Sequence, residues 1–208
     1  NLWMGNHAGA PGTYDPQSFA RSDPRFEEPD FAAEARRRTQ HDLTSSEATR
    51  YWAGEAWRFI RESPGAWAAV IGRKLALFWH GTELPGNLDY EFVRRRVPWL
   101  AGPWLSFGII GPLALVGLVV ARGRSALPVL YVASYLMATL IFFVLSEYRH
   151  PAAVAGCWFA AAAVVWGWDR LREGRRAGVW LAGVVALAGM AWAIRPYVLI
   201  SQETSYLM

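Results

Sequence analysis

Four long runs without a charged residue fill the second half of the chain, at 97–121, 125–146, 151–168 and 177–194. A helix needs about 20 apolar residues to cross the roughly 30 Å of hydrocarbon in a bilayer. The pattern therefore predicts four transmembrane helices, at about 103–121, 126–145, 151–168 and 177–194. Residues 1–100 are mostly polar by comparison. We expect a mainly α-helical polytopic membrane protein, with an external helical and loop segment (1–100) before a four-helix transmembrane region (101–208).

The first part of the external segment is rich in residues that break regular structure. Residues 1–14 hold three Gly, one Pro and two Asn, which predicts a structured loop. This loop either serves as a scaffold or contacts a ligand. Residues 15–30 contain three prolines and are expected to form a linker. A short helix is predicted from Phe31 to about Gln40, and its run Arg36–Arg38 is interpreted as a solvated face.

Two further helices are expected before the apolar runs. Thr44 and Glu47 fit a capping box, in which a hydroxyl and a carboxylate satisfy the first backbone amides of a helix. An amphipathic helix should follow as far as Glu62. Ser63-Pro64 then restarts a helix near 64–80, which Arg73 and Lys74 interrupt. Its tryptophans and basic pair suit a helix in the lipid headgroup region, and a buried helix of the external segment is the alternative.

Composition and charge support a membrane location. The chain is 53% hydrophobic and has 12 Trp, a residue that membrane interfaces favour. The net charge of +4 comes from two short loops, 122–125 and 169–176, so nucleic-acid binding is not supported. These loops carry six arginines: Arg122, Arg124, Arg170, Arg172, Arg175 and Arg176. Long polar segments cross the membrane largely regardless of charge, so we place the two loops in the cytoplasm and residues 1–100 outside.

Two features bound the chemistry. Cys157 is the single cysteine and lies in an apolar run, so neither an intrachain disulfide nor a cysteine-rich metal site is expected. The chain starts at Asn1 without a signal sequence, and we interpret it as a fragment of a longer polypeptide.

A charged stretch, Ser146-Glu147-Tyr148-Arg149-His150-Pro151, separates the second and third apolar runs. We predict that it is a tight turn at the outer membrane surface. Arg149 is either a snorkelling anchor for a helix end or a contact for a headgroup phosphate, to which a guanidinium presents a fork of donors. The hydroxyl of Tyr148 could assist it.

Two other groups are candidates for binding. Glu83 and Asp89 flank a Gly/Pro/Asn turn, where paired carboxylates perform acid–base chemistry, hold a divalent cation, or simply cap and solvate the turn. Arg94, Arg95 and Arg96 lie just before the first apolar run, on the side where positive charge is uncommon. Such an exception suggests binding of a phosphate or a phospholipid headgroup.

Three segments, in this order, carry a resemblance to a known family. Asn-Leu-Trp-Met-Gly-Asn-His-Ala-Gly-Ala-Pro-Gly-Thr-Tyr (1–14), Glu-Leu-Pro-Gly-Asn-Leu-Asp-Tyr (83–90) and Glu-Tyr-Arg-His-Pro (147–151) resemble the C-terminal half of bacterial family-39-type glycosyltransferases of the GT-C class. The last segment is similar to an Arg-Tyr-Arg-Leu-Pro turn in that family. Glu147 and His150 depart from its pattern.

The resemblance implies a multi-pass enzyme of the bacterial inner membrane. Such an enzyme takes a sugar from a polyprenyl-phosphate donor and transfers it to an acceptor at the periplasmic face. It also implies that the catalytic carboxylate lies upstream of this chain. The implied substrate-binding residues are Arg149, Tyr148, Glu83, Asn6, Arg94, Arg95 and Arg96. A non-catalytic membrane scaffold and an amphiphile transporter or flippase are the alternatives, although the apolar runs lack the buried ionisable residues that transporters use.

Overall fold

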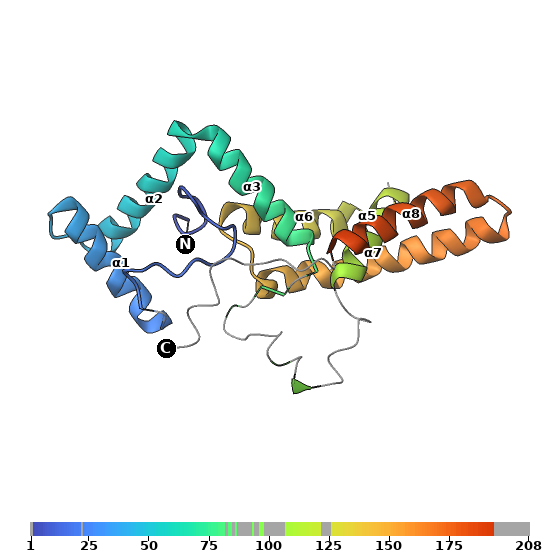
Figure 1. Cartoon of the computed structure of the whole chain (residues 1–208), viewed down its shortest axis with the longest axis horizontal. Coiled ribbons are helices and arrows are strands. Elements are labelled where there is room, and N and C mark those ends of the chain that lie inside the picture. The colour runs from blue at the N-terminus through green and yellow to red at the C-terminus, as the bar shows by residue number, and fades with distance from the viewer. Residues whose placement is uncertain are drawn as a thin grey trace. The chain divides into compact units, whose positions relative to one another are not determined.

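The computed structural model describes residues 2–21, 23–81, 83–84, 86, 93, 96–97, 107–121 and 126–193. Helices dominate these residues, as predicted: α1 (Pro24–Thr39), α2 (Ser45–Glu62), α3 (Pro64–Trp79), α5 (Phe107–Val120), α6 (Ala126–Ile141), α7 (Ser146–Arg172) and α8 (Arg176–Ala193) (Figure 1). The chain divides into two compact units. Unit 1 comprises Asn1–Phe78, Leu84–Leu88 and Ala133–Arg149, and unit 2 comprises Trp79–Glu83, Asp89–Val132 and His150–Met208.

Helix α1 begins earlier than the sequence pattern predicts. Its N-cap is Asp23, whose side chain accepts a hydrogen bond from the backbone N–H of Arg25. The interpretation of 15–30 as a linker is therefore wrong from Pro24 onward. Proline is tolerated at the first position of a helix because the N–H that it lacks would have no helical partner there. The helix ends at Thr39, and its C-cap residue Gln40 adopts a left-handed conformation with φ of 58°.

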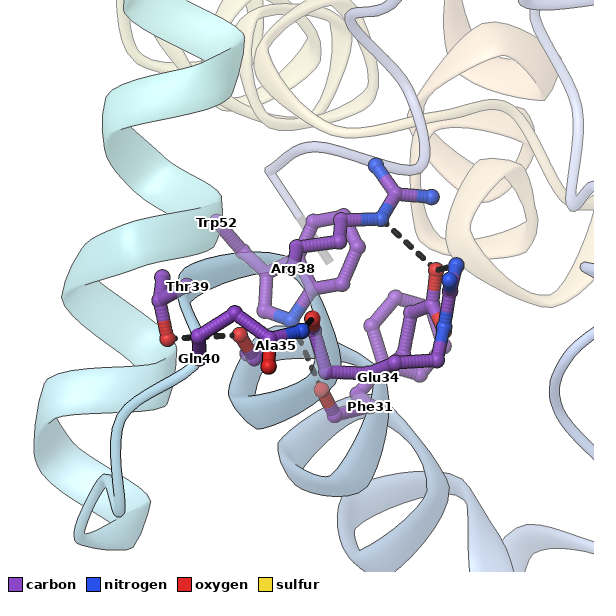
Figure 2. Close-up of polar contacts among 8 residues, drawn as sticks. Phe31, Glu34, Ala35, Arg38, Thr39, Gln40 and Trp52 are labelled. Atoms are coloured by element: carbon purple, nitrogen blue, oxygen red, sulfur yellow. Dashed lines mark hydrogen bonds and ion pairs between the residues drawn. The ribbon is translucent and has the colours of Figure 1, made fainter.

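Helix α2 confirms the predicted capping box. The backbone N–H of Thr44 donates to the Glu47 carboxylate at 2.8 Å, and the Glu47 N–H donates back to the Thr44 hydroxyl at 3.4 Å. Helices α1 and α2 pack together around Ala32, Ala35, Ala48 and Trp52, with Trp3, Phe19 and Phe31 at the edge of this core. The indole N–H of Trp52 donates to the carbonyl of Phe31 at 3.0 Å (Figure 2).

The arginine run at the end of α1 lies largely on a solvated face, as predicted. Arg37 and Arg38 both pair with the buried Glu34 at 2.7 Å, and these ion pairs lower the pKa of Glu34 to about 2. Figure 2 shows the Arg38 guanidinium bonded to Glu34 beside the Trp52 ring. Two guanidiniums thus neutralise the one buried carboxylate of this helix.

Helix α3 buries one face in unit 1, formed by Val70, Lys74, Leu77 and Phe78. These positions follow the three- and four-residue spacing of a helical stripe. A buried helix, one of the two alternatives given for this segment, explains this face. The other alternative, a location in the lipid headgroup region, stays a prediction.

The predicted turn at 146–151 is wrong. Residues 146–151 form the beginning of α7, and the break between the apolar runs lies at 142–145 instead. Glu147 occupies the first turn of α7, where the partial positive charge of a helix N-terminus favours a carboxylate. The break is held within unit 1 by a parallel β-bridge between Thr13 and Val144.

Unit 2 is built on apolar helices with small residues between them. Ala114, Ala121 and Phe159 form its core, and α5 also packs on α8. A Cβ added at Gly156 would lie 3.6 Å from Ile110 and 3.7 Å from Ala114, while Ala152 and Ala160 are buried. The small residue at Gly156 therefore allows α7 to lie close to α5. Helices α7 and α8 form an antiparallel hairpin (Figure 1), with Gly174 at φ +77° in the connection.

Among the described residues, two of the four predicted spans form helices that are long and apolar enough to cross a membrane. They are α7, with 27 residues, and α8, with 18 residues. Only 28% and 11% of their apolar windows are buried, which is unlike the core helix of a soluble protein. Helices α5 and α6 are apolar but have only 14 and 16 residues. The expected first span also includes residues 103–106, which lie outside the described residues.

Candidate anion-binding site

The side chain of Asn6 forms four hydrogen bonds within unit 1. It is 2% exposed, and its amide nitrogen donates to the carbonyls of Leu2 at 2.8 Å and Ile141 at 2.7 Å. Its amide oxygen accepts from the indole of Trp67 at 3.1 Å and from Lys74 Nζ at 3.2 Å. One side chain thus ties the 1–14 loop to α3 and to the end of α6.

Glycines allow this loop to lie against the 142–145 break. A Cβ added at Gly5 would fall 1.5 Å from the carbonyl oxygen of Phe142, so no larger residue fits there. Gly12 has φ of +90°, which glycine adopts without strain. Its carbonyl accepts from the N–H of Val144 at 2.9 Å. The loop is therefore a close-packed scaffold on which Asn6 is held.

Lys74 is the only lysine of the chain, and it is 0% exposed. Its ammonium donates to Asn6 Oδ1 and, at 2.9 Å, to the carbonyl of Leu140. Both acceptors are neutral, and no carboxylate of the described residues forms an ion pair with it. Burial lowers the pKa of Lys74 to about 8, because a low-dielectric surrounding disfavours the charged form.

Lys74 is not among the binding residues predicted from the sequence. The Arg73-Lys74 pair was interpreted only as an interruption of an apolar helix. The available signal was its place on the apolar stripe, four residues after Val70 and three before Leu77. A cation on the core face of a helix needs a partner, whether in the protein or in a ligand.

Arg149 is also buried in unit 1, at 1% exposure. Its Nη1 lies 3.4 Å from the carbonyl oxygens of both Leu77 and Phe78 in the last turn of α3. These carbonyls carry the partial negative charge of a helix C-terminus, which favours a cation. A snorkelling side chain would reach water, so that alternative does not describe Arg149. The alternative of a phosphate contact remains a prediction.

Arg73 contributes a third cation from α3. Its guanidinium donates to the carbonyl of Ala10 at 2.8 Å and so fixes the second half of the loop. Arg73, Lys74 and Arg149 all bind backbone or amide oxygens in unit 1. The arrangement is cationic and closely packed.

The remaining predicted residues add no hydrogen bond to Lys74 among the described residues. Tyr148 is 45% exposed, and its ring centroid lies 5.9 Å from that of Phe143. Glu83 is half-buried and belongs to unit 2, and Arg96 is exposed. Arg94, Arg95 and Asp89 lie outside the described residues. No group of three or more His, Cys, Asp or Glu in the described part of the chain could hold a metal ion, so a divalent cation gains no support.

No protein-family model, curated protein or solved structure matches the chain significantly.

Proposed function

We propose that this chain is the C-terminal part of a bacterial inner-membrane glycosyltransferase that uses a polyprenyl-phosphate-linked sugar. The observation that carries the proposal is the buried ammonium of Lys74, whose partners among the described residues are neutral oxygens. Residues 1–100 would face the periplasm, and the apolar helices would hold the chain in the bilayer.

The free-energy cost of burying a charge supports this proposal. Removing an ammonium from water costs several kcal/mol unless an opposite charge offsets it. In unit 1 this cost falls on Lys74, whose two acceptors among the described residues are neutral. A phosphate anion would offset this cost, and a lipid phosphate is an anion that reaches a membrane protein directly from the bilayer.

The chemistry of the transfer fits cations of this kind. When the anomeric carbon–oxygen bond of the donor breaks, the electron pair stays on the lipid phosphate while the acceptor oxygen bonds to the sugar. Guanidinium and ammonium donors stabilise that charge most strongly where water is excluded. Arg149 and Lys74 would bind the phosphate, Tyr148 and Asn6 would lie beside it, and the carboxylate that activates the acceptor would come from polypeptide upstream of Asn1.

The first experiment measures the pKa of the single lysine. The chain is labelled with [13C]lysine and placed in lipid nanodiscs that contain either polyprenyl phosphate or the uncharged polyprenol of equal length. The NMR signal of the lysine is then followed as the pH is varied. We expect the phosphate to raise the pKa of Lys74 by at least about one unit, since a nearby anion favours the ammonium form. The alcohol should leave it unchanged. An identical pKa with both lipids would contradict the site.

The second experiment tests transfer itself. In the full-length protein, Arg149→Ala should abolish sugar transfer while expression is retained. Arg58→Ala is the matched control, because Arg58 is exposed and, among the described residues, forms its ion pair with Glu55 on the surface of α2. Wild-type transfer rates in Arg149→Ala would overturn the proposed role.

A further inference from the structure

A cavity that does not include the buried cations lies in unit 1, where the N-terminal loop meets α1 and α2. Its volume is about 440 Å³. This size falls in the range of about 300–1,000 Å³ that small-molecule sites occupy. The lining residues come from three segments: residues 2–4, the first half of α1 and the first half of α2.

Aromatic rings form one wall of this cavity. The ring centroids of Trp3 and Trp52 are 4.5 Å apart, and Phe31 lies 5.2 Å from Trp52 and 6.2 Å from Trp3. The faces of aromatic rings carry negative charge density and attract cations. The same cluster already holds one cation, because the Arg38 guanidinium lies 4.9 Å from the Trp52 ring centroid (Figure 2).

The charge of the cavity is negative in a chain that is positive overall. Glu27 and Glu28 line it, and none of the described residues that line it is a lysine, an arginine or a histidine. Within the part of the chain that the structure describes, neither carboxylate has a hydrogen bond or an ion pair. This contrasts with Glu34 of the same helix, which is paired with two arginines. The two carboxylates that line the cavity are therefore without a cationic partner among the described residues.

We propose that this cavity binds a small organic ammonium ion, with its alkyl groups against Trp3, Phe31 and Trp52 and its charge facing Glu27 and Glu28. Aromatic faces beside carboxylates match such a cation in both shape and charge. The hydroxyls of Ser45 and Thr49 add polar positions for the rest of the ligand. The site is independent of the proposed glycosyltransferase activity.

The test compares two ligands that differ in charge but not in shape. The full chain is placed in phosphatidylglycerol nanodiscs, which carry no choline headgroup, and is titrated calorimetrically with choline or with its uncharged isostere 3,3-dimethylbutan-1-ol. We expect choline to bind at least about tenfold more tightly than the isostere. Equal affinities, or no choline binding by the folded chain, would overturn the proposal.

Two variants assign the selectivity to residues. The double substitution Glu27→Gln/Glu28→Gln keeps the shape of the cavity and should remove the preference for choline. Glu62→Gln is the matched control, because Glu62 is an exposed carboxylate at the end of α2 that does not line the cavity. A preference that survives in the double variant, or that disappears in the control, would contradict the role of Glu27 and Glu28.

Discussion

The ammonium of Lys74 lies 3.2 Å from the side-chain oxygen of Asn6, a residue 68 positions earlier in the chain. The amide of Asn6 in turn donates to the carbonyl of Ile141 at 2.7 Å. Through this pair the loop, α3 and the end of α6 share one buried polar network. A neutral amide oxygen orients the ammonium but does not offset its charge.

This relationship predicts that unit 1 is more stable at alkaline pH. The pKa of Lys74 is about 8 in the folded chain and 10.5 in the unfolded reference. Between these values the unfolded chain binds more protons, so the free energy of unfolding rises with pH. The shift sets an upper limit of about 3 kcal/mol on the gain.

Chemical unfolding between pH 8 and 9.5, followed by circular dichroism, measures this slope. Lys74→Met replaces the lysine with an uncharged side chain of similar length. The free energy of unfolding of this variant should therefore rise less steeply with pH than that of the wild type. Tyr14, whose burial raises its pKa above 10, titrates outside this window. Equal slopes in the two proteins would show that Lys74 is not the group responsible.

The second prediction concerns the role of Arg149 in folding. Arg149→Met removes the donor that reaches the carbonyls of Leu77 and Phe78, which would leave buried oxygens without this partner. We expect a loss of about 2–3 kcal/mol in the free energy of unfolding. Arg58→Met, on an exposed surface, should change it by less than about 0.5 kcal/mol. A loss in both variants alike would assign the effect to the charge and not to the buried contacts.

Local features of the fold could be predicted from the sequence. The capping box of α2 involves Thr44 and Glu47, three residues apart, and the structure reproduces it. The start of α1 was missed because Pro24 and Pro29 indicate a break when they are considered alone. The N-cap at Asp23 decides that Pro24 begins a helix instead.

The boundaries of the apolar runs do not mark the boundaries of the helices. The charged residues at 147–150 indicated a turn, yet they lie inside the first turns of α7. The break at 142–145 is apolar in sequence, and its conformation comes from the bridge between Thr13 and Val144. Because the two bridged residues are far apart in the chain, no local sequence pattern indicates the bridge.

The candidate site shows the same limit. Asn6 and Arg149 were selected from their motifs, and both lie in unit 1 as buried polar residues. Lys74 was not selected, because its acceptors are far away in sequence, at Asn6 and Leu140. Burial of a cation is a property of the assembled unit.

The third prediction tests the close approach of α5 and α7 in unit 2. A Cβ at Gly117 would fall 1.8 Å from the carbonyl oxygen of Phe159, so Gly117→Ala must push the two backbones apart. We expect a loss of about 1–3 kcal/mol or more, measured by denaturation in detergent micelles. Gly183→Ala has open space around its new methyl group and should be neutral or slightly stabilising. Equal stability of the two variants would contradict this helix packing.

The fourth prediction uses Cys157, the only cysteine, to test whether α7 crosses a membrane. Cys157 is exposed on α7, so in a soluble protein an aqueous maleimide should modify it readily. If α7 spans the bilayer, lipid covers this position, and modification should occur only after the membrane is dissolved in denaturing detergent.

Arg175→Cys in a Cys157→Ser background places the thiol in the loop between α7 and α8, where Arg175 is exposed. This variant should react in inside-out vesicles and not in intact cells, because we predict that the loop lies in the cytoplasm. Rapid labelling of Cys157 in intact membranes would contradict the span, and labelling of Arg175→Cys from outside would reverse the proposed topology.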